Sequence, residues 1–146
     1  MGVGFPFNRK GIKDFFAIAK ERPDIKFFWF GYLSKALMTN DVRRAIKHKP
    51  NNVIMPGYID NSIIKGCYRY AKCMLFPTYE ETEGIVALEA LASECPLLVR
   101  DIGVYEDWLT DGVNCYKAKN NEEFLSKLDH ILNTDNKEVI SNIKVH

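Results

Sequence analysis

The chain has 146 residues, 47% of them hydrophobic, and a formal net charge of +1. This length suits one domain that can bury a core, and the balanced charge does not indicate a nucleic-acid partner. No apolar run is long enough to cross a membrane, and the first residues lack the pattern of a signal peptide. The four cysteines have no CxxC spacing and the three histidines are scattered. We therefore expect reduced core cysteines of a cytosolic protein, and neither a zinc site nor a Ser/His/Asp triad.

Strand-like and helix-like segments alternate along the chain. We predict strands at about 1–5, 25–30, 52–55, 73–76, 96–100 and 114–116. Helices are predicted between and after them, at about 9–21, 34–48, 60–71, 83–93, 103–109 and 120–133, and the polar tail after these is a short helix or coil. Strands such as FFWF are apolar throughout, as expected of strands buried on both faces. This alternation predicts the α/β class, with a parallel sheet covered by helices on both faces.

The loop after the first predicted strand carries two cations. Parallel sheets of this kind bind ligands beyond the carboxyl ends of their strands, where the loops after strands one, two and four should meet. Arg9 and Lys10 lie at the start of a helix, where cations oppose the helix dipole unless an anion such as a phosphate offsets them. Solvated surface positions for both are an equally good interpretation. GxGxxG and P-loop fingerprints are absent, which argues against dinucleotide and ATP sites of those kinds.

The stretch PTYEETEGIVALEALAS, residues 77–93, joins an acidic loop to a helix with almost no polar face. From Gly84 onward its only charged side chain is Glu89, so we predict a buried helix and a carboxylate that needs a polar partner or a ligand hydroxyl. Glu81 lies two turns earlier, about 12 Å along the axis, which would put the two carboxylates at two ends of one site. Gly84 leaves the first helix amides free, as in anion-binding helix N-termini.

Helix capping is a simpler interpretation of the acids before this helix. Glu80, Glu81 and Glu83 would favour its positive end, and Thr82 would serve as the N-cap. From the pattern alone, capping is the favoured account of Glu80 and Glu83 but not of Glu89.

A basic cluster precedes the third strand. At helical spacing it covers one broad face, which is typical of a solvated surface, and contact with anionic lipid headgroups is the alternative. The cluster consists of Arg43, Arg44, Lys47, His48 and Lys49.

A Glu-x7-Glu pattern, Glu81 to Glu89, follows a strand and FPT and precedes GIVALEALA, a strand and a DIG segment. With VGFPFNRKGI, NVIMPGYI and LLVRDIGVYEDWLTDGVNCY, it resembles the C-terminal, nucleotide-sugar-binding domain of retaining glycosyltransferases of family 4 with the GT-B fold. RKGI, EETEGIVALEALA and RDIGVYEDWLTDGVNCY look most like the bacterial branch that glycosylates diacylglycerol. The resemblance implies a Rossmann-like three-layer sandwich with a parallel sheet of about six strands, one half of a GT-B enzyme.

The resemblance also implies a role for each site residue. Glu89 would bind the ribose hydroxyls, Glu81 would lie at the donor sugar as the catalytic candidate, and Lys10 would contact the diphosphate. Amides at the start of the helix would help to hold the phosphate and the sugar, namely those around Glu83, Gly84 and Ile85. Such cations and amides stabilise a nucleoside-diphosphate leaving group without a metal or another cofactor.

Two positions depart from the family pattern. Many members have an arginine directly after the glycine of the first strand, whereas Phe5 follows Gly4 here. That diphosphate contact is therefore assigned to Arg9. Glu83 occupies a position that is often aromatic or apolar, and an acid beside a phosphate is unfavourable, so Glu83 is expected to face a sugar hydroxyl or solvent.

Residues 1–146 would then form the C-terminal donor domain, without the N-terminal acceptor domain. We expect it to bind UDP-glucose or UDP-galactose and to be inactive alone. The whole enzyme would transfer the hexose to a lipid such as diacylglycerol or a monoglycosyl diacylglycerol, at the cytoplasmic face of the membrane. The alternatives are a glycosyltransferase of capsule or other surface polysaccharide assembly, hexose-nucleotide epimerisation on the same architecture, and a noncatalytic α/β interaction domain.

Overall fold

The computed structural model of the chain describes residues 1–81 and 84–145, with side chains described up to residue 142. Its strands are all parallel and form two three-stranded sheets, ordered β1-β2-β3 and β4-β5-β6. They are β1 Gly2–Val3, β2 Phe27–Phe30, β3 Val53–Ile54, β4 Met74–Phe76, β5 Leu97–Arg100 and β6 Tyr116–Ala118. The sheets meet where the Leu75 amide donates to the Met1 carbonyl at 2.8 Å. The strands therefore follow the order β3-β2-β1-β4-β5-β6.

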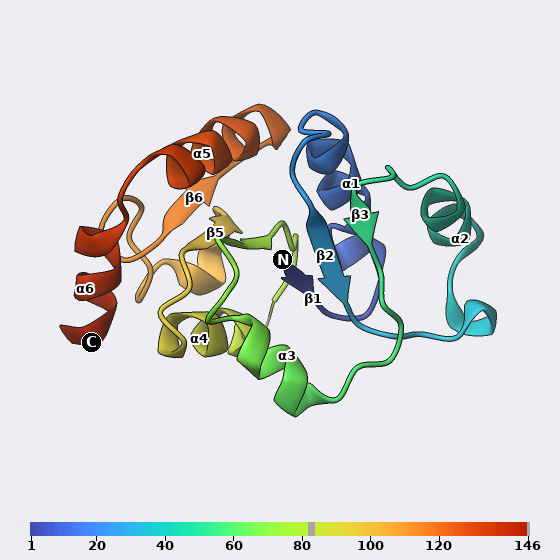
Figure 1. Cartoon of the computed structure of the whole chain (residues 1–146), viewed down its shortest axis with the longest axis horizontal. Helices are drawn as coiled ribbons and strands as arrows, with labels where there is room; N and C mark the ends of the chain where they lie inside the picture. Colours follow the sequence, from blue (N-terminus) through green and yellow to red (C-terminus); the bar gives the residue numbers. More distant parts are fainter. Residues whose placement is uncertain (82–83, 146) are drawn as a thin grey trace.

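Helices cover both faces of the strands (Figure 1), with α1, α2 and α5 on one side and α3 and α4 on the other. They are α1 Ile12–Lys20, α2 Asn40–Lys47, α3 Asn61–Cys67, α4 Ile85–Ala92, α5 Asn121–Asn133 and α6 Lys137–Val145. Three 3-10 turns complete the elements, η1 Asn8–Lys10, η2 Lys35–Leu37 and η3 Gly103–Tyr105. The predicted three-layer α/β architecture is confirmed.

The core consists of two apolar clusters, one on each face of the strands. On the α1 and α5 side, Leu98 packs with Phe15 and Phe124, and all three are fully buried. On the α4 side, Val99 packs with Ala87, which is also fully buried. Because side chains alternate along a strand, neighbouring residues of β5 belong to opposite clusters. This accounts for the uniformly apolar sequence of the central strands.

Some predicted boundaries were wrong. The helix predicted at 34–48 is divided into η2 and α2, because the backbone at Met38 and Thr39 is extended. The helix predicted at 103–109 is reduced to the single turn η3. The Asn114 side chain accepts from the Thr110 amide and donates to the Trp108 carbonyl, so it takes up groups that a longer helix would need. The last strand lies at Tyr116–Ala118, two residues later than predicted.

Helix α4 is not buried on all sides, contrary to the prediction from its sequence. Ala87 and Ala90 are fully buried, whereas Ile85 and Leu88 are 54% and 49% exposed. The small alanines allow the helix to lie close to the strands, and the larger aliphatic residues lie on the outer side. The N-cap is Gly84 rather than Thr82.

Gly11 fixes how closely the start of α1 approaches the loop after β4. Its φ is 76°, and an added Cβ would lie 2.2 Å from the Pro77 carbonyl oxygen. A side chain at this position is excluded both by the left-handed backbone and by the neighbouring loop.

We therefore predict that Gly11→Ala lowers the free energy of unfolding by about 2 to 4 kcal/mol, from backbone strain plus displacement of Pro77. Urea denaturation measures the loss. Gly112→Ala is the matched control, because Gly112 has a φ of 77° but no atom within 4 Å of the added Cβ. It should lose only about 1 kcal/mol. Equal losses in the two variants would show that the close approach to Pro77 contributes nothing.

Candidate functional site

The candidate site lies beyond the carboxyl ends of β1 and β4, where the strand order reverses. Strands β2 and β3 extend from β1 to one side, and β5 and β6 extend from β4 to the other. Loops that leave neighbouring strands in opposite directions open a crevice between them, which is where parallel α/β sheets bind ligands. The loop after β1 leads to η1 and α1, and the loop after β4 leads to α4.

Backbone contacts join these two loops directly. The Arg9 carbonyl accepts from the Tyr79 amide at 2.8 Å, and the Thr78 hydroxyl lies 3.0 Å from the same oxygen. Thr78 is fully buried. Lys10 directly follows Arg9, and Glu81 lies two residues after Tyr79, so this contact brings Lys10 and Glu81 close together.

Lys10 and Glu81 form an ion pair. Nζ of Lys10 donates to Oε2 of Glu81 at 2.8 Å, and the two side chains are only 16% and 15% exposed. The ammonium also lies 5.8 Å from the centre of the Phe76 ring. A pair shielded from water interacts more strongly than a surface pair, and its lysine has donors left for a second acceptor. The pair therefore offers an anionic ligand a cation already held in position.

The Arg9 side chain is placed differently. It is exposed, and its guanidinium lies 5.4 Å from the centre of the Phe7 ring. The Arg9 backbone contacts the loop after β4, whereas its side chain has no described contact with that loop.

Helix α4 begins after the loop that leaves β4, at the same edge of the sheet. Gly84 adopts a φ of 69° and supplies no side-chain cap, so among the described residues no side chain caps the first helix amides. An added Cβ on Gly84 would lie 3.0 Å from the Trp108 ring and 3.1 Å from the Tyr105 ring. Exposed amides at a helix start favour anions. Glu83, predicted to lie here, falls outside the described residues.

Glu89 has a partner that the sequence analysis did not identify. Its Oε2 accepts from the Tyr68 hydroxyl at 3.4 Å. Burial, with a further contribution from the Glu89 carboxylate, raises the pKa of Tyr68, so this hydroxyl stays protonated and can donate. The contact joins α4 to the residue that follows α3, whereas Lys10 and Glu81 join η1 to the loop after β4. The two carboxylates thus belong to separate contacts.

Tyr105 is a second tyrosine that the sequence analysis missed. It is fully buried, packs beside Gly84 and Trp108, and its hydroxyl has no hydrogen-bond partner within the described residues. Burial, reinforced by the Glu81 carboxylate, raises its pKa. Tyrosines in apolar segments give no sequence signal that separates such a group from an ordinary core residue.

Elsewhere in the described part of the chain, the cysteines, histidines and acids form no second candidate site. In residues 1–81 and 84–145, no group of histidine, cysteine and acidic side chains could hold a metal ion. Cys73, Cys95 and Cys115 are buried free thiols, as predicted, and Cys67 is half-buried. Burial raises the pKa of Cys73 and Cys115 to about 12 and that of Cys95 to about 11, which keeps these thiols unreactive. No described helix is long and apolar enough to cross a membrane.

The basic cluster is mostly solvated, as its pattern indicated. Arg43, Arg44, Lys47 and His48 are exposed. Lys49 is half-buried and donates to the Val53 carbonyl at 2.6 Å.

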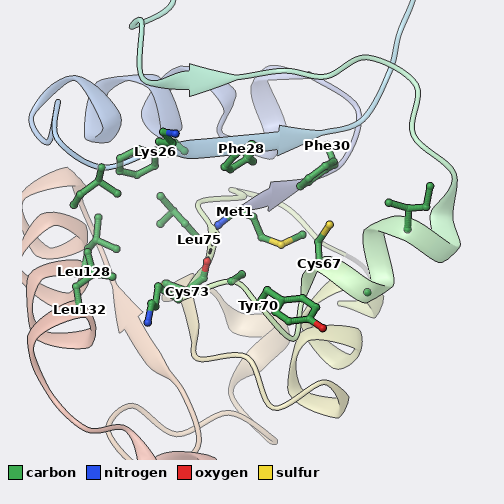
Figure 2. A pocket seen from close by; sticks show the side chains of 16 residues that line it. Met1, Lys26, Phe28, Phe30, Cys67, Tyr70, Cys73, Leu75, Leu128 and Leu132 are labelled. Carbon is green, nitrogen blue, oxygen red and sulfur yellow. Dashed lines mark hydrogen bonds between the residues drawn. The ribbon is translucent and has the colours of Figure 1, made fainter.

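An apolar cavity of about 590 Å³ lies away from the candidate site. It runs along the α3 face, and Figure 2 shows Met1 between Phe28 and Phe30 of β2 and the side chains of Cys67 and Tyr70. No residue predicted to contact the donor lines it. Although this cavity is large, its apolar lining lacks the predicted donor-binding residues, so we do not assign the nucleotide-sugar site to it.

Comparison with known proteins identifies the family of the chain. A family model described as glycosyl transferases group 1 matches residues 3–144. A processive diacylglycerol alpha-glucosyltransferase from Acholeplasma laidlawii is 50% identical over 142 residues, which cover 97% of this chain and 43% of that relative. An alpha-galactosylglucosyldiacylglycerol synthase from Streptococcus pneumoniae is 34% identical over 109 residues, or 73% of this chain and 29% of that protein. The chain thus spans less than half the length of these relatives.

Solved structures show the same fold. The C-terminal domain of a glycosyl transferase group 1 family protein from Francisella tularensis aligns with a TM-score of 0.76 and 24% identity, over 97% of this chain and 80% of that one. A sucrose-phosphate synthase from Thermosynechococcus elongatus aligns with a TM-score of 0.83 and 19% identity, over 99% of this chain and 40% of that one. With the family match over almost its whole length, the chain belongs to the group 1 glycosyltransferases and has the fold of one half of a GT-B enzyme.

Proposed function

We propose that the chain binds a nucleoside-diphosphate hexose, UDP-glucose or UDP-galactose, beyond the carboxyl ends of β1 and β4. It would form the donor-binding half of a retaining glycosyltransferase. The observation that carries this proposal is the shielded pair of Lys10 and Glu81, at the same edge of the sheet as the start of α4. A cation and free helix amides directed at one crevice suit a diphosphate.

In this proposal the diphosphate takes over part of the hydrogen bonding of Lys10. The ammonium has three donors, so it can bind a phosphate oxygen while it keeps or releases Glu81. Glu81 then lies at the donor sugar. Negative charge grows on the diphosphate as the glycosidic bond breaks, and Lys10, the amides near Ile85 and the nearby Arg9 stabilise that charge. These groups would make a metal ion unnecessary.

Glu89 would bind the ribose in the same complex. A carboxylate accepts hydrogen bonds from both hydroxyls of a vicinal diol, and the Tyr68 hydroxyl would hold that carboxylate in place. For Glu83 the predictions stay as they were: its backbone amide would help to hold the phosphate and the sugar, and its side chain would face a sugar hydroxyl or solvent.

The acceptor is proposed from the relatives. Two of them are named for glycosylation of diacylglycerol or its glycosides, and this supports a lipid acceptor. Because the chain spans 43% of the Acholeplasma protein, transfer would require a further domain that carries the acceptor, and the whole enzyme would work at the cytoplasmic membrane face. A role in capsule or other polysaccharide assembly would require a different acceptor on the same donor site.

We predict that Lys10→Met weakens UDP-glucose binding about 10- to 100-fold, because a charge-assisted hydrogen bond to phosphate is lost. Calorimetric titration without divalent metal measures this change. Lys13→Met is the matched control, because Lys13 lies on the same segment and is also ion-paired, to Asp41 at 2.6 Å. Its effect should be less than twofold. A wild-type chain that binds no UDP at millimolar concentration would contradict the proposal and favour a noncatalytic interaction domain.

We also predict that Glu89→Gln removes the preference for ribose. The wild-type chain should bind UDP more tightly than 2′-deoxy-UDP, by about tenfold for a charged hydrogen bond. Glu89→Gln should bind both nucleotides with similar, weak affinity. Comparing the two ligands on both proteins isolates the pairwise interaction. If the variant kept the full preference for ribose, another group would have to bind the 2′-hydroxyl.

A further inference from the structure

Arg100 is a buried charged residue at the end of β5, and the sequence analysis assigned it no role. The residue is 7% exposed. Its guanidinium donates from Nε to the Pro77 carbonyl at 3.2 Å, from Nη1 to the Lys119 carbonyl at 3.2 Å, and from Nη2 to Oδ2 of Asp14 at 3.3 Å. Its edge therefore bonds to three separate segments of the chain.

Aromatic rings pack around the same guanidinium. Its central carbon lies 3.9 Å from the centre of the Tyr79 ring and 5.2 Å from that of Phe124. A buried guanidinium is stable only when its donors are bonded, and ring packing adds to this. Because the fork is planar and rigid, its partners are held in one mutual arrangement. These partners lie on α1, on the loops after β4 and β6, and on α5.

The loop held by Arg100 is the one that positions the candidate site. Pro77, which accepts from Arg100, is the residue that Gly11 approaches, and Tyr79 donates its amide to the Arg9 carbonyl. The Tyr79 hydroxyl donates to Asp14, which also binds Arg100. Glu81 follows two residues later and meets Lys10.

We propose that Arg100 is the positioning residue that holds Glu81 against Lys10. Its contacts on both sides of Thr78 keep the loop after β4 against η1, although Arg100 itself contacts neither member of the pair. The positioning of the Lys10–Glu81 pair by Arg100 does not depend on what the chain binds. The consequence for nucleotide binding rests on the proposed function.

The competing account is that Arg100 only stabilises the core. Arg22 provides the matched control for that account. It links the segment after α1 to α5, with Nε and Nη2 donating to Asp129 at 2.8 and 2.5 Å, and it has no hydrogen bond to a described residue of the candidate site. Loss of either arginine should lower stability, whereas loss of Arg100 alone should alter the pair.

The test uses NMR of the lysine ammonium groups in the 146-residue chain without ligand. The signal of Lys10 is assigned by its absence in Lys10→Arg, and Glu81→Gln gives its position when the pair is broken. In Arg100→Met the Lys10 signal should move toward that position or disappear through faster exchange with water. In Arg22→Met it should remain unchanged. Titration with UDP should then show binding about tenfold weaker for Arg100→Met and within twofold of wild type for Arg22→Met.

An unchanged Lys10 signal in folded Arg100→Met would overturn the proposal. If that variant does not fold, Tyr79→Leu decides the question, because it removes the packed ring at a residue that is 49% exposed. It should move the Lys10 signal in the same direction, and an unchanged signal would again reject the proposal. A signal that moves in a chain that does not bind UDP would uphold the positioning role and reject the proposed function.

Discussion

The carbonyl oxygen of Arg9 joins the two halves of the fold at the edge where ligands are expected. It accepts from the Tyr79 amide and lies within hydrogen-bond distance of the Thr78 hydroxyl. The loops after β1 and β4 start from neighbouring strands but lead to helices on opposite faces. This short backbone contact holds them together, and it requires Gly11, where any side chain would meet Pro77. The relative position of the two loops is therefore fixed in part by backbone packing, independently of the charged side chains.

Charge then gives the crevice its chemistry. A lysine near a helix start is unfavourable by itself, and here Glu81 offsets it within a largely shielded pair. An incoming diphosphate would offer Lys10 a stronger acceptor and would also meet the free amides of α4. The Glu81 carboxylate, which pairs with Lys10 in the structure, would then be available to the donor sugar. One ion pair thus connects the packing of the two loops with the proposed recognition of the donor.

The sequence predicted the parts of this arrangement that depend on local pattern. Alternating apolar strands and helices indicated the parallel sheet, and the position of Lys10 and Glu81 after neighbouring strands placed them at one edge. It did not identify Tyr68 or Arg100, because their contacts with Glu89 and Asp14 join residues distant in the chain. The sequence also led us to overestimate the burial of α4. In a helix with apolar residues on every side, the pattern does not indicate that the alanines face the sheet. Exposure of Ile85 and Leu88 follows from packing, not from periodicity.

The most direct test of this account is a backbone amide NMR titration of the chain with UDP, which locates bound nucleotide residue by residue. We expect the largest shifts at Lys10, Gly84 and Ile85, with few changes around the apolar cavity lined by Phe28 and Tyr70. Shifts centred on that cavity, or spread evenly over the surface, would contradict it.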